Sequence, residues 1–286
     1  MGEFNLININ SSFESYQQLI DLYHENKNRQ FEIIKISFQQ WFDANLSSVL
    51  GGVLDKLHWN LNTIQFNFNS SDIQTIIQKN NFLSHFGYEK VNNLHNTTIK
   101  YNKLKPSDGK FFHKYVFNEV LEHPELPNIS LELKKKIAES IYEIFINAKQ
   151  HSKSEFIYTC GQFFPTKHIL KFTITDIGID FKNQINNKFK KNLSSIQAIK
   201  WAMIDGNSTK QDTGGIGLTI LKEFICMNEG KMQIVSNDGF YQLDVDEVKT
   251  KFFSNNFPGT IINMEFKTDD AKSYILNGEI ELNDIF

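Results

Sequence analysis

The sequence predicts an α+β protein built from two units, and three observations indicate this organisation. Strand-like and helix-like segments alternate over residues 31–86, which is typical of a small α/β unit. A polar, irregular stretch follows at 88–110, with a turn cluster at Lys105-Pro-Ser-Asp-Gly109. A long helical segment and a series of strands then fill the second half. We therefore expect an N-terminal unit at 1–105 and a second unit at 106–286.

The composition is that of a globular protein. Of the 286 residues, 40% are apolar and 22% charged, which is enough apolar material for real cores. The net charge of -3 gives no overall attraction to nucleic acid or to an anionic membrane. The two cysteines are too few for a disulfide framework, and neither a membrane-spanning run nor a secretion signal is recognisable. A soluble cytoplasmic protein without a nucleic-acid or membrane partner is expected.

In the N-terminal unit, apolar residues that recur at helical spacing alternate with short β-rich runs. Ser37-Phe-Gln-Gln40 resembles a capping box, and Ser71-Asp-Ile-Gln74 is expected to cap a further helix. The predicted elements are a helix at 16–24, a strand at 31–38, a helix containing the apolar residues from Leu46 to Leu57, a strand at 63–68 and a helix at 71–83.

The second unit is expected to begin with helices and to continue with strands. A polar segment at 180–212 separates its two halves. The predicted elements are a helix at 111–121, a helix from Ser130 to about Ser152, strands at 156–163 and 169–175, a short helix at 196–202, a helix from the glycine turn at 214–217 to Met227, strands at 232–236 and 260–266, and a hairpin within 274–286 around Asn277-Gly278.

The helix that follows Ser130 carries two stripes. One is apolar and is expected to face a core: Ile137, Ile141, Ile144 and Ala148. The other consists of Glu143, Asn147 and His151, spaced four residues apart. A carboxylate can deprotonate a nucleophile, and a neutral amide oxygen can bind a hard ion such as magnesium. The alternative is an ordinary solvated polar face.

The strand at 169–175 runs into Asp176-Ile-Gly178. An aspartate at a strand end can accept a hydrogen bond from an exocyclic amine such as that of adenine. Glycine at 178 leaves room for a flat ring against the backbone. The alternative is a plain Asp-x-Gly turn.

A glycine-rich turn, Gly214-Gly215-Ile216-Gly217-Leu218, precedes the helix that ends at Met227. Exposed N–H groups at the start of a helix favour phosphates. The turn lacks the Lys-Ser/Thr of a P-loop and the glycine fingerprint of a dinucleotide fold. A flexible loop with a glycine cap is the alternative for this turn alone. In this order and spacing, the three segments predict an ATP site.

Together these segments resemble the GHKL ATPase superfamily, named for gyrase, a heat-shock chaperone, histidine kinases and a mismatch-repair ATPase. The resemblance covers about residues 110–268. It is specific, because five segments fall in the family order. They are Glu143-x-x-x-Asn147-Ala148-x-x-His151 as the N box, Asp176-Ile-Gly178 and Gly215-Ile-Gly217-Leu218 as the two glycine boxes, and the strand ends Ser236-Asn-Asp-Gly239 and Phe257-Pro-Gly-Thr260.

The resemblance implies a two-layer α/β sandwich in which ATP lies between a mixed sheet and its helices under a mobile lid. ATP and Mg²⁺ are the implied cofactors, and residues 180–212 are the implied lid. The roles it implies are general base for Glu143, magnesium ligand for Asn147, adenine contacts for Asp176 and Gly178, a water-mediated adenine contact for Thr260, and nucleotide contacts for His151, Thr209, Lys210, Gly214, Gly215, Ile216, Gly217 and Leu218. For Lys210 a plain solvated lysine is the alternative.

Two departures from the family pattern bear on the subtype. Asp180 stands where the first glycine box usually has its second glycine, and a carboxylate there could repel phosphate or restrict the lid. His151 replaces an aromatic residue and Gln150 replaces a lysine. These replacements are closer to the anti-sigma-factor serine kinases than to sensor histidine kinases.

The N-terminal unit resembles a STAS domain, the module of anti-sigma-factor antagonists, in rhythm only. In that family the serine that receives phosphate follows a strand and begins a helix, a place that Asn69-Ser70-Ser71-Asp72 occupies here. The alternative is a serine that simply caps the helix.

Three functions stay open from the sequence. The first is a regulatory serine-type kinase that acts on a protein partner or a STAS-like module. The second is an ATPase whose hydrolysis drives a conformational or homodimerisation cycle, including stress or defence switches. The third is a nucleotide-binding interaction module with little catalysis.

Overall fold

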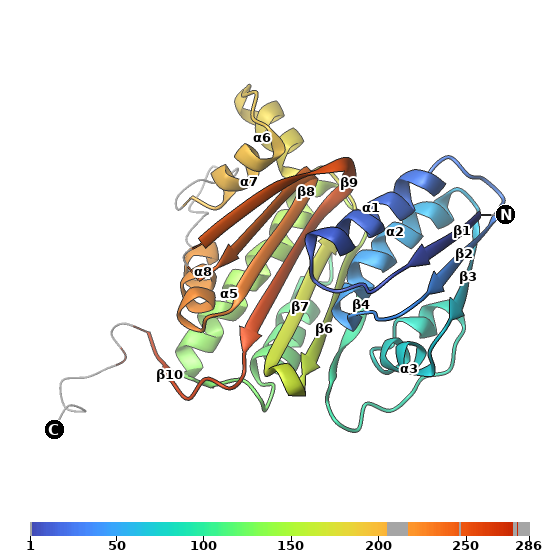
Figure 1. The fold of residues 1–286 in the computed structure, drawn as a ribbon. Helices are drawn as coiled ribbons and strands as arrows, with labels where there is room; N and C mark the ends of the chain where they lie inside the picture. The colour runs from blue at the N-terminus through green and yellow to red at the C-terminus, as the bar shows by residue number, and fades with distance from the viewer. Residues whose placement is uncertain (1, 205–216, 246, 277–278, 280–286) are drawn as a thin grey trace.

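Two larger sheets organise the part of the chain that the computed structural model describes, which is residues 2–204, 217–245, 247–276 and 279. Figure 1 shows the N-terminal sheet at one side of the molecule and the second sheet near its centre. The mixed α and β content agrees with the predicted fold class. Among the described helices, none combines the length and the apolar character that a membrane span requires.

The N-terminal sheet has three parallel strands in the order β1-β2-β3. Helices return the chain between successive strands, as parallel pairing requires. The elements are β1 (Gly2–Leu6), α1 (Phe13–Asn26), β2 (Ile33–Phe38), the 3₁₀ turn η1 (Ala44–Leu46), α2 (Ser47–Trp59), β3 (Thr63–Phe68), α3 (Ser71–Lys79) and the 3₁₀ turn η2 (Leu83–Phe86). The predicted strand at 63–68 is confirmed, and the predicted helix at 16–24 lies within α1.

The second sheet has five strands in the order β4-β6-β7-β9-β8, and all neighbours are antiparallel. The strands are β4 (Thr98–Leu104), β6 (Ile157–Phe164), β7 (Ile169–Asp176), β8 (Lys231–Asp244) and β9 (Glu247–Lys267). The prediction of an irregular stretch at 88–110 is wrong for β4, which pairs with β6 at the edge of this sheet. The expected unit boundary at 105 therefore falls after a strand of the second sheet.

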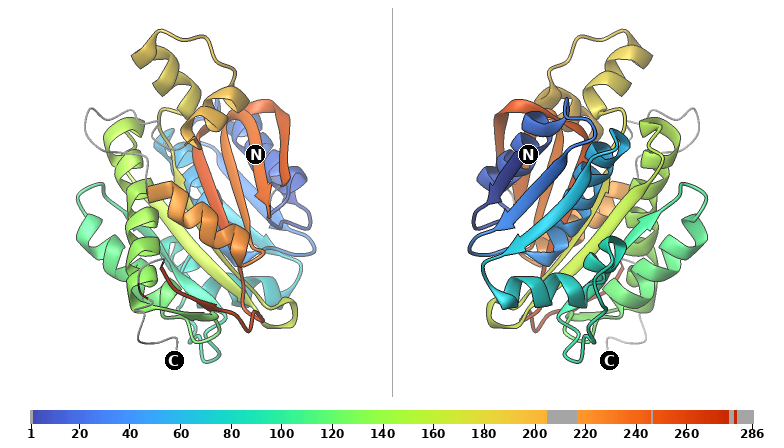
Figure 2. Two further views of the ribbon diagram at one scale, coloured as in Figure 1. Left: turned by 90° about the vertical axis from the view of Figure 1, so that its left-hand side faces the viewer. Right: turned by 90° about the vertical axis from the view of Figure 1, so that its right-hand side faces the viewer.

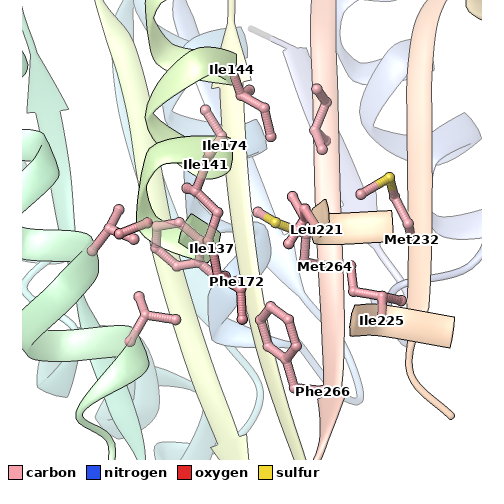
Figure 3. Close-up of a cluster of buried hydrophobic side chains, with 14 of the residues drawn as sticks. Ile137, Ile141, Ile144, Phe172, Ile174, Leu221, Ile225, Met232, Met264 and Phe266 are labelled. Carbon is pink, nitrogen blue, oxygen red and sulfur yellow. The ribbon is translucent and has the colours of Figure 1, made fainter. Parts of the chain in front are cut away.

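Helices cover one face of the five-stranded sheet. They are α4 (Gly109–Tyr115), the π-helical segment η3 (Val116–Leu121), α5 (Leu131–Asn147), the π-helical turn η4 (Ala148–Ser152) and α8 (Gly217–Met227). Ser130 caps α5 as predicted, since its side chain accepts a hydrogen bond from the N–H of Leu133. The predicted apolar stripe of α5 is buried and belongs to one core with Phe172 of β7 and Leu221 of α8 (Figure 3).

The opposite face of the five-stranded sheet is covered by α1 and α2. Val49 and Val53 of α2 share a core with Tyr158 of β6, Val235 of β8 and Ile261 of β9. The parallel sheet lies outside these helices (Figure 2). The N-terminal unit, which the sequence predicted as a smaller α/β unit, thus adds two layers behind the larger sheet: α1 with α2, and the parallel sheet.

Two helices stand at one end of the five-stranded sheet, near the hairpin of β8 and β9 (Figure 1). They are α6 (Phe181–Phe189) and α7 (Ser195–Ala202). The predicted short helix at 196–202 is confirmed as α7, whereas α6 was not expected. The hairpin is also longer than the two predicted strands, because pairing continues past the irregularity between Ser236 and Gly239.

Two capping predictions are wrong. Ser37 lies inside β2, where its hydroxyl donates to Glu3, and α2 begins only after η1. Ser70 rather than Ser71 caps α3, which ends at Lys79. The predicted hairpin around Asn277-Gly278 lies outside the described residues. Before it, β10 (Ser273–Tyr274) pairs in parallel with β5 (Asn128–Ile129).

Alternate residues of β7 contact the two neighbouring layers, as the pleat of a strand requires. Phe172 and Ile174 belong to the core beneath α5. The odd-numbered residues contact η1, the residue before it and α2. This set of contacts, here called the β7 ladder, consists of Lys171 Nζ to Asp43 (2.9 Å), Asn45 Nδ2 to Thr173 Oγ1 (2.9 Å), Thr175 Oγ1 to Ser48 Oγ (3.4 Å) and Ile177 against Gly52.

Lys171→Met is expected to destabilise the fold by about 3–5 kcal/mol, because it leaves the buried Asp43 carboxylate without its cation. Lys231→Met is the matched control. Lys231 lies 3.6 Å from Glu265, which Lys171 also approaches, but its side chain is 27% exposed, so we expect a loss below about 1 kcal/mol. Urea unfolding of both variants measures the difference. Equal losses would contradict the importance assigned to the buried pair.

Candidate functional site

A small pocket of about 30 Å³ lies between the end of α5, the strands β7 and β9, and the start of α6. Its walls combine apolar side chains with a few polar groups, which is typical of small-molecule sites. The lining residues are Ile144, Ala148, Ile174, Phe181 and Ile262 together with Asn147, Asp176, Gln184 and Thr260. The structure thus brings the predicted site residues Asn147, Asp176 and Thr260 together from three different elements.

Asp176 is the most unusual polar group of this pocket. It is 7% exposed, and its Oδ1 atom has no hydrogen-bond partner among the described residues. Burial raises the pKa of Asp176 to about 7; the nearby Asp180 carboxylate acts in the same direction, and the Ser152 side chain and the Gly178 N–H oppose it. A buried carboxylate with an unpaired oxygen costs folding free energy. This arrangement points to a ligand that donates a hydrogen bond.

The turn after Asp176 is held from several sides. The N–H of Ile179 donates to the Ser152 carbonyl at 2.6 Å, and the N–H of Ile177 donates to Ser154 Oγ at 3.1 Å. A Cβ atom at Gly178 would overlap the Ser152 carbonyl. Glycine at 178 is therefore required by the close approach of two backbone segments, whether or not a ring also lies beside it.

The pocket end of α5 continues into the π-helical turn η4. Asn147 is the last residue of α5 and lines the pocket, and Glu143 lies one turn earlier in a half-buried position. His151 lies within η4. Ser152 Oγ donates to the Ala148 carbonyl at 2.6 Å, and Lys153 then ends the helix with φ 54°. π-helical turns are rare and occur frequently at functional sites.

Thr260 lies opposite Asp176 in the pairing of β7 with β9. It is buried, and its hydroxyl lies 3.1 Å from that of Ser236 on β8. Two hydroxyls beside a buried carboxylate can form hydrogen bonds with a water molecule or with the polar edge of a ligand. The position of Thr260 is therefore compatible with the water-mediated role that the resemblance implied.

Asp180 has a structural role that the sequence did not indicate. It is the N-cap of α6, and its carboxylate accepts three hydrogen bonds, from Asn183 N (2.9 Å), Asn183 Nδ2 (2.7 Å) and Asn237 Nδ2 (3.0 Å). Aspartate is among the residues that cap helices best. The acid at this position therefore starts a helix, which carries Phe181 and Gln184 onto the pocket.

The glycine turn is described only in part. Gly217 and Leu218 are the first two residues of α8, which packs beside α5 through Leu221 and Ile225 (Figure 3). The predicted contacts Thr209, Lys210, Gly214, Gly215 and Ile216 lie outside the described residues.

No group of three or more His, Cys, Asp or Glu side chains converges to hold a metal ion within the described ranges.

No protein-family model matches the chain, and comparison with curated proteins finds no match.

Sequence reasoning missed several residues that form this site. Phe181 and Gln184 were included in an irregular lid, although Phe181, Ile185 and Phe189 recur every four residues and could have predicted α6. Ser152 and Ser154 carry no recognisable motif. Their importance follows only from the hydrogen bonds that they make to the turn after Asp176.

Proposed function

We propose that this pocket binds the adenine of ATP and that the chain is an ATP-dependent protein of the histidine-kinase-like type. The observation that carries the proposal is the buried Asp176 carboxylate with its unpaired oxygen in a pocket of apolar walls. Adenine presents an exocyclic amine that can donate to such an acceptor, and apolar side chains like those of the pocket can pack against its flat ring. The order of the N-box and glycine segments supports the same reading.

On the phosphate side, we propose that Asn147 holds Mg²⁺ together with phosphate oxygens. When bound, the ion neutralises charge on the phosphates. Glu143, one turn earlier on α5, would accept the proton of the attacking hydroxyl or water. The start of α8 would offer N–H groups to the phosphates, because a helix N-terminus favours anions.

Calorimetric titration with Mg·ATP and Mg·GTP tests the adenine assignment. Guanine has an oxo group where adenine has its amine, so it offers Asp176 no donor at this position. We expect ATP to bind and GTP to bind at least about tenfold more weakly, which corresponds to about 1.4 kcal/mol. Equal affinities, or no binding of either nucleotide, would contradict the proposal.

The destination of the phosphate is a separate question, and γ-labelled ATP decides it. Label that appears on a protein hydroxyl supports a serine-type kinase acting on a protein partner or a second copy of the chain. Label released as free phosphate supports an ATPase that drives a conformational or dimerisation cycle. Binding without either product supports a nucleotide-dependent interaction module. In Asn69-Ser70-Ser71-Asp72, the candidate acceptor segment of the N-terminal unit, Ser70 has the capping role in this structure.

A further inference from the structure

Helix α2 contains two consecutive glycines, Gly51 and Gly52, in its interior. Glycine inside a helix costs about 1 kcal/mol relative to alanine, so a close contact is the expected reason for each. A Cβ atom at Gly52 would lie 2.7 Å from Cγ1 of Ile177, and one at Gly51 would overlap the hydroxyl of Tyr101 on β4. Both glycines therefore let α2 approach the five-stranded sheet closely.

The contact at Gly52 matters because Ile177 directly follows Asp176. The β7 ladder links Thr175 to Ser48 and Ile177 to Gly52, so both neighbours of Asp176 contact α2. The Asp176 carboxylate itself faces the opposite side and lines the pocket. On the neighbouring strand, a Cβ atom at Gly259 would overlap the Asp176 carbonyl. The backbone at Asp176 is thus enclosed by α2 on one side and β9 on another.

We propose that α2 of the N-terminal unit positions Asp176 for recognition of the purine amine, so that Gly52 and Ser48 are positioning residues of the nucleotide site. This inference rests on the proposed adenine pocket. A hydrogen bond from an amine to a carboxylate requires a donor–acceptor distance of about 2.7–3.2 Å and a nearly straight donor angle. Contacts that hold the backbone at 175–177 therefore hold the carboxylate within this range. The N-terminal unit then contributes to nucleotide selectivity without touching the nucleotide.

The experiment compares ATP with inosine triphosphate, which carries an oxo group in place of the purine 6-amine. The ratio of their dissociation constants, measured by calorimetry, reports recognition of the purine edge formed by the 6-amine and N1, because the 6-oxo base also carries a proton on N1. A variant with a generally damaged fold binds both nucleotides more weakly by the same factor, so the ratio of dissociation constants is unchanged. We expect the wild-type protein to prefer ATP.

Gly52→Ala is expected to reduce this preference by about tenfold, because its methyl group displaces Ile177 and so disturbs a hydrogen bond to a charged group, which is stronger than one between neutral groups. Gly51→Ala is the matched control. It adds the same methyl group one residue earlier, but against Tyr101 on the edge strand β4, and is expected to keep the preference. Adding Ile177→Ala to Gly52→Ala removes the overlap and is expected to restore most of the preference.

Ser48→Ala provides a second test, because it adds no bulk and deletes the hydroxyl that accepts from Thr175 and donates to the Asn45 carbonyl. We expect the preference to fall by about threefold, the equivalent of a weak hydrogen bond. An unchanged preference in both Gly52→Ala and Ser48→Ala, with wild type still selecting ATP, overturns the positioning role and leaves the adenine pocket standing. A wild-type protein that binds neither nucleotide contradicts the proposed function itself.

Discussion

Asp176→Asn is expected to weaken ATP binding about 10–100-fold and, at the same time, to stabilise the free protein at pH 8. The first effect follows from loss of a charged acceptor, since hydrogen bonds to charged groups contribute about 1.5–3 kcal/mol. The second follows from burial. Asparagine keeps the shape of the side chain but removes a charge that the free pocket does not compensate.

The pH dependence of this second effect has a defined sign. Burial raises the pKa of Asp176 from 3.8 to about 7 in the folded protein, so the folded form binds the proton more tightly than the unfolded form. The free energy of unfolding therefore decreases as the pH rises from about 4 to 7. A difference of about three units corresponds to roughly 4 kcal/mol as an upper estimate. The gain from Asp176→Asn should be largest above pH 7 and should vanish near pH 4.

Urea unfolding at pH 5 and pH 8, combined with calorimetric titration of ATP, measures both effects. Asp180→Asn is the control, because the loss of the three hydrogen bonds that this carboxylate accepts opposes the relief of its repulsion of Asp176. We expect no stabilisation from it. If Asp176→Asn destabilised the protein at pH 8, the assigned cost of burying the charge would be wrong. Unaltered ATP affinity would count against the adenine assignment.

Glu143→Gln is expected to lower the rate of phosphoryl transfer by about 10²–10⁴-fold while the affinity for ATP changes little. General base catalysis contributes a factor of this size, and glutamine keeps the shape of the side chain without accepting the proton. Release or transfer of label from γ-labelled ATP measures the rate, and calorimetry measures the affinity.

Glu139→Gln is the matched control for this variant. Glu139 lies one turn earlier on α5, where its exposed carboxylate pairs with Lys136. We expect it to leave the rate of phosphoryl transfer unchanged. If Glu143→Gln behaved in the same way, the base would have to be sought elsewhere.

Local features of the fold could be predicted from the sequence with good accuracy. The strand at 63–68, the cap at Ser130 and the apolar stripe of α5 are all present in the structure. Each depends on interactions within one element or on the repeat of apolar residues, and such signals lie close together in the chain. Ser37 is the instructive exception. Its sequence resembles a capping box, but Ser37 lies in a strand that pairs with β1. Because this pairing joins segments far apart in the chain, no local pattern could predict it.

For the candidate site, the sequence by itself determined which residues are chemically suited to bind a nucleotide, and in what order they occur. Only the tertiary structure decided that the Asp176 side chain is buried with an unpaired oxygen, that Asp180 starts a helix over the pocket, and that α2 lies behind the strand carrying Asp176. The physical reason is that burial, pKa and close backbone approach depend on segments far apart in the chain. Gly52 and Ile177 are 125 positions apart in the numbering, so their contact forms only when α2 packs against the end of β7.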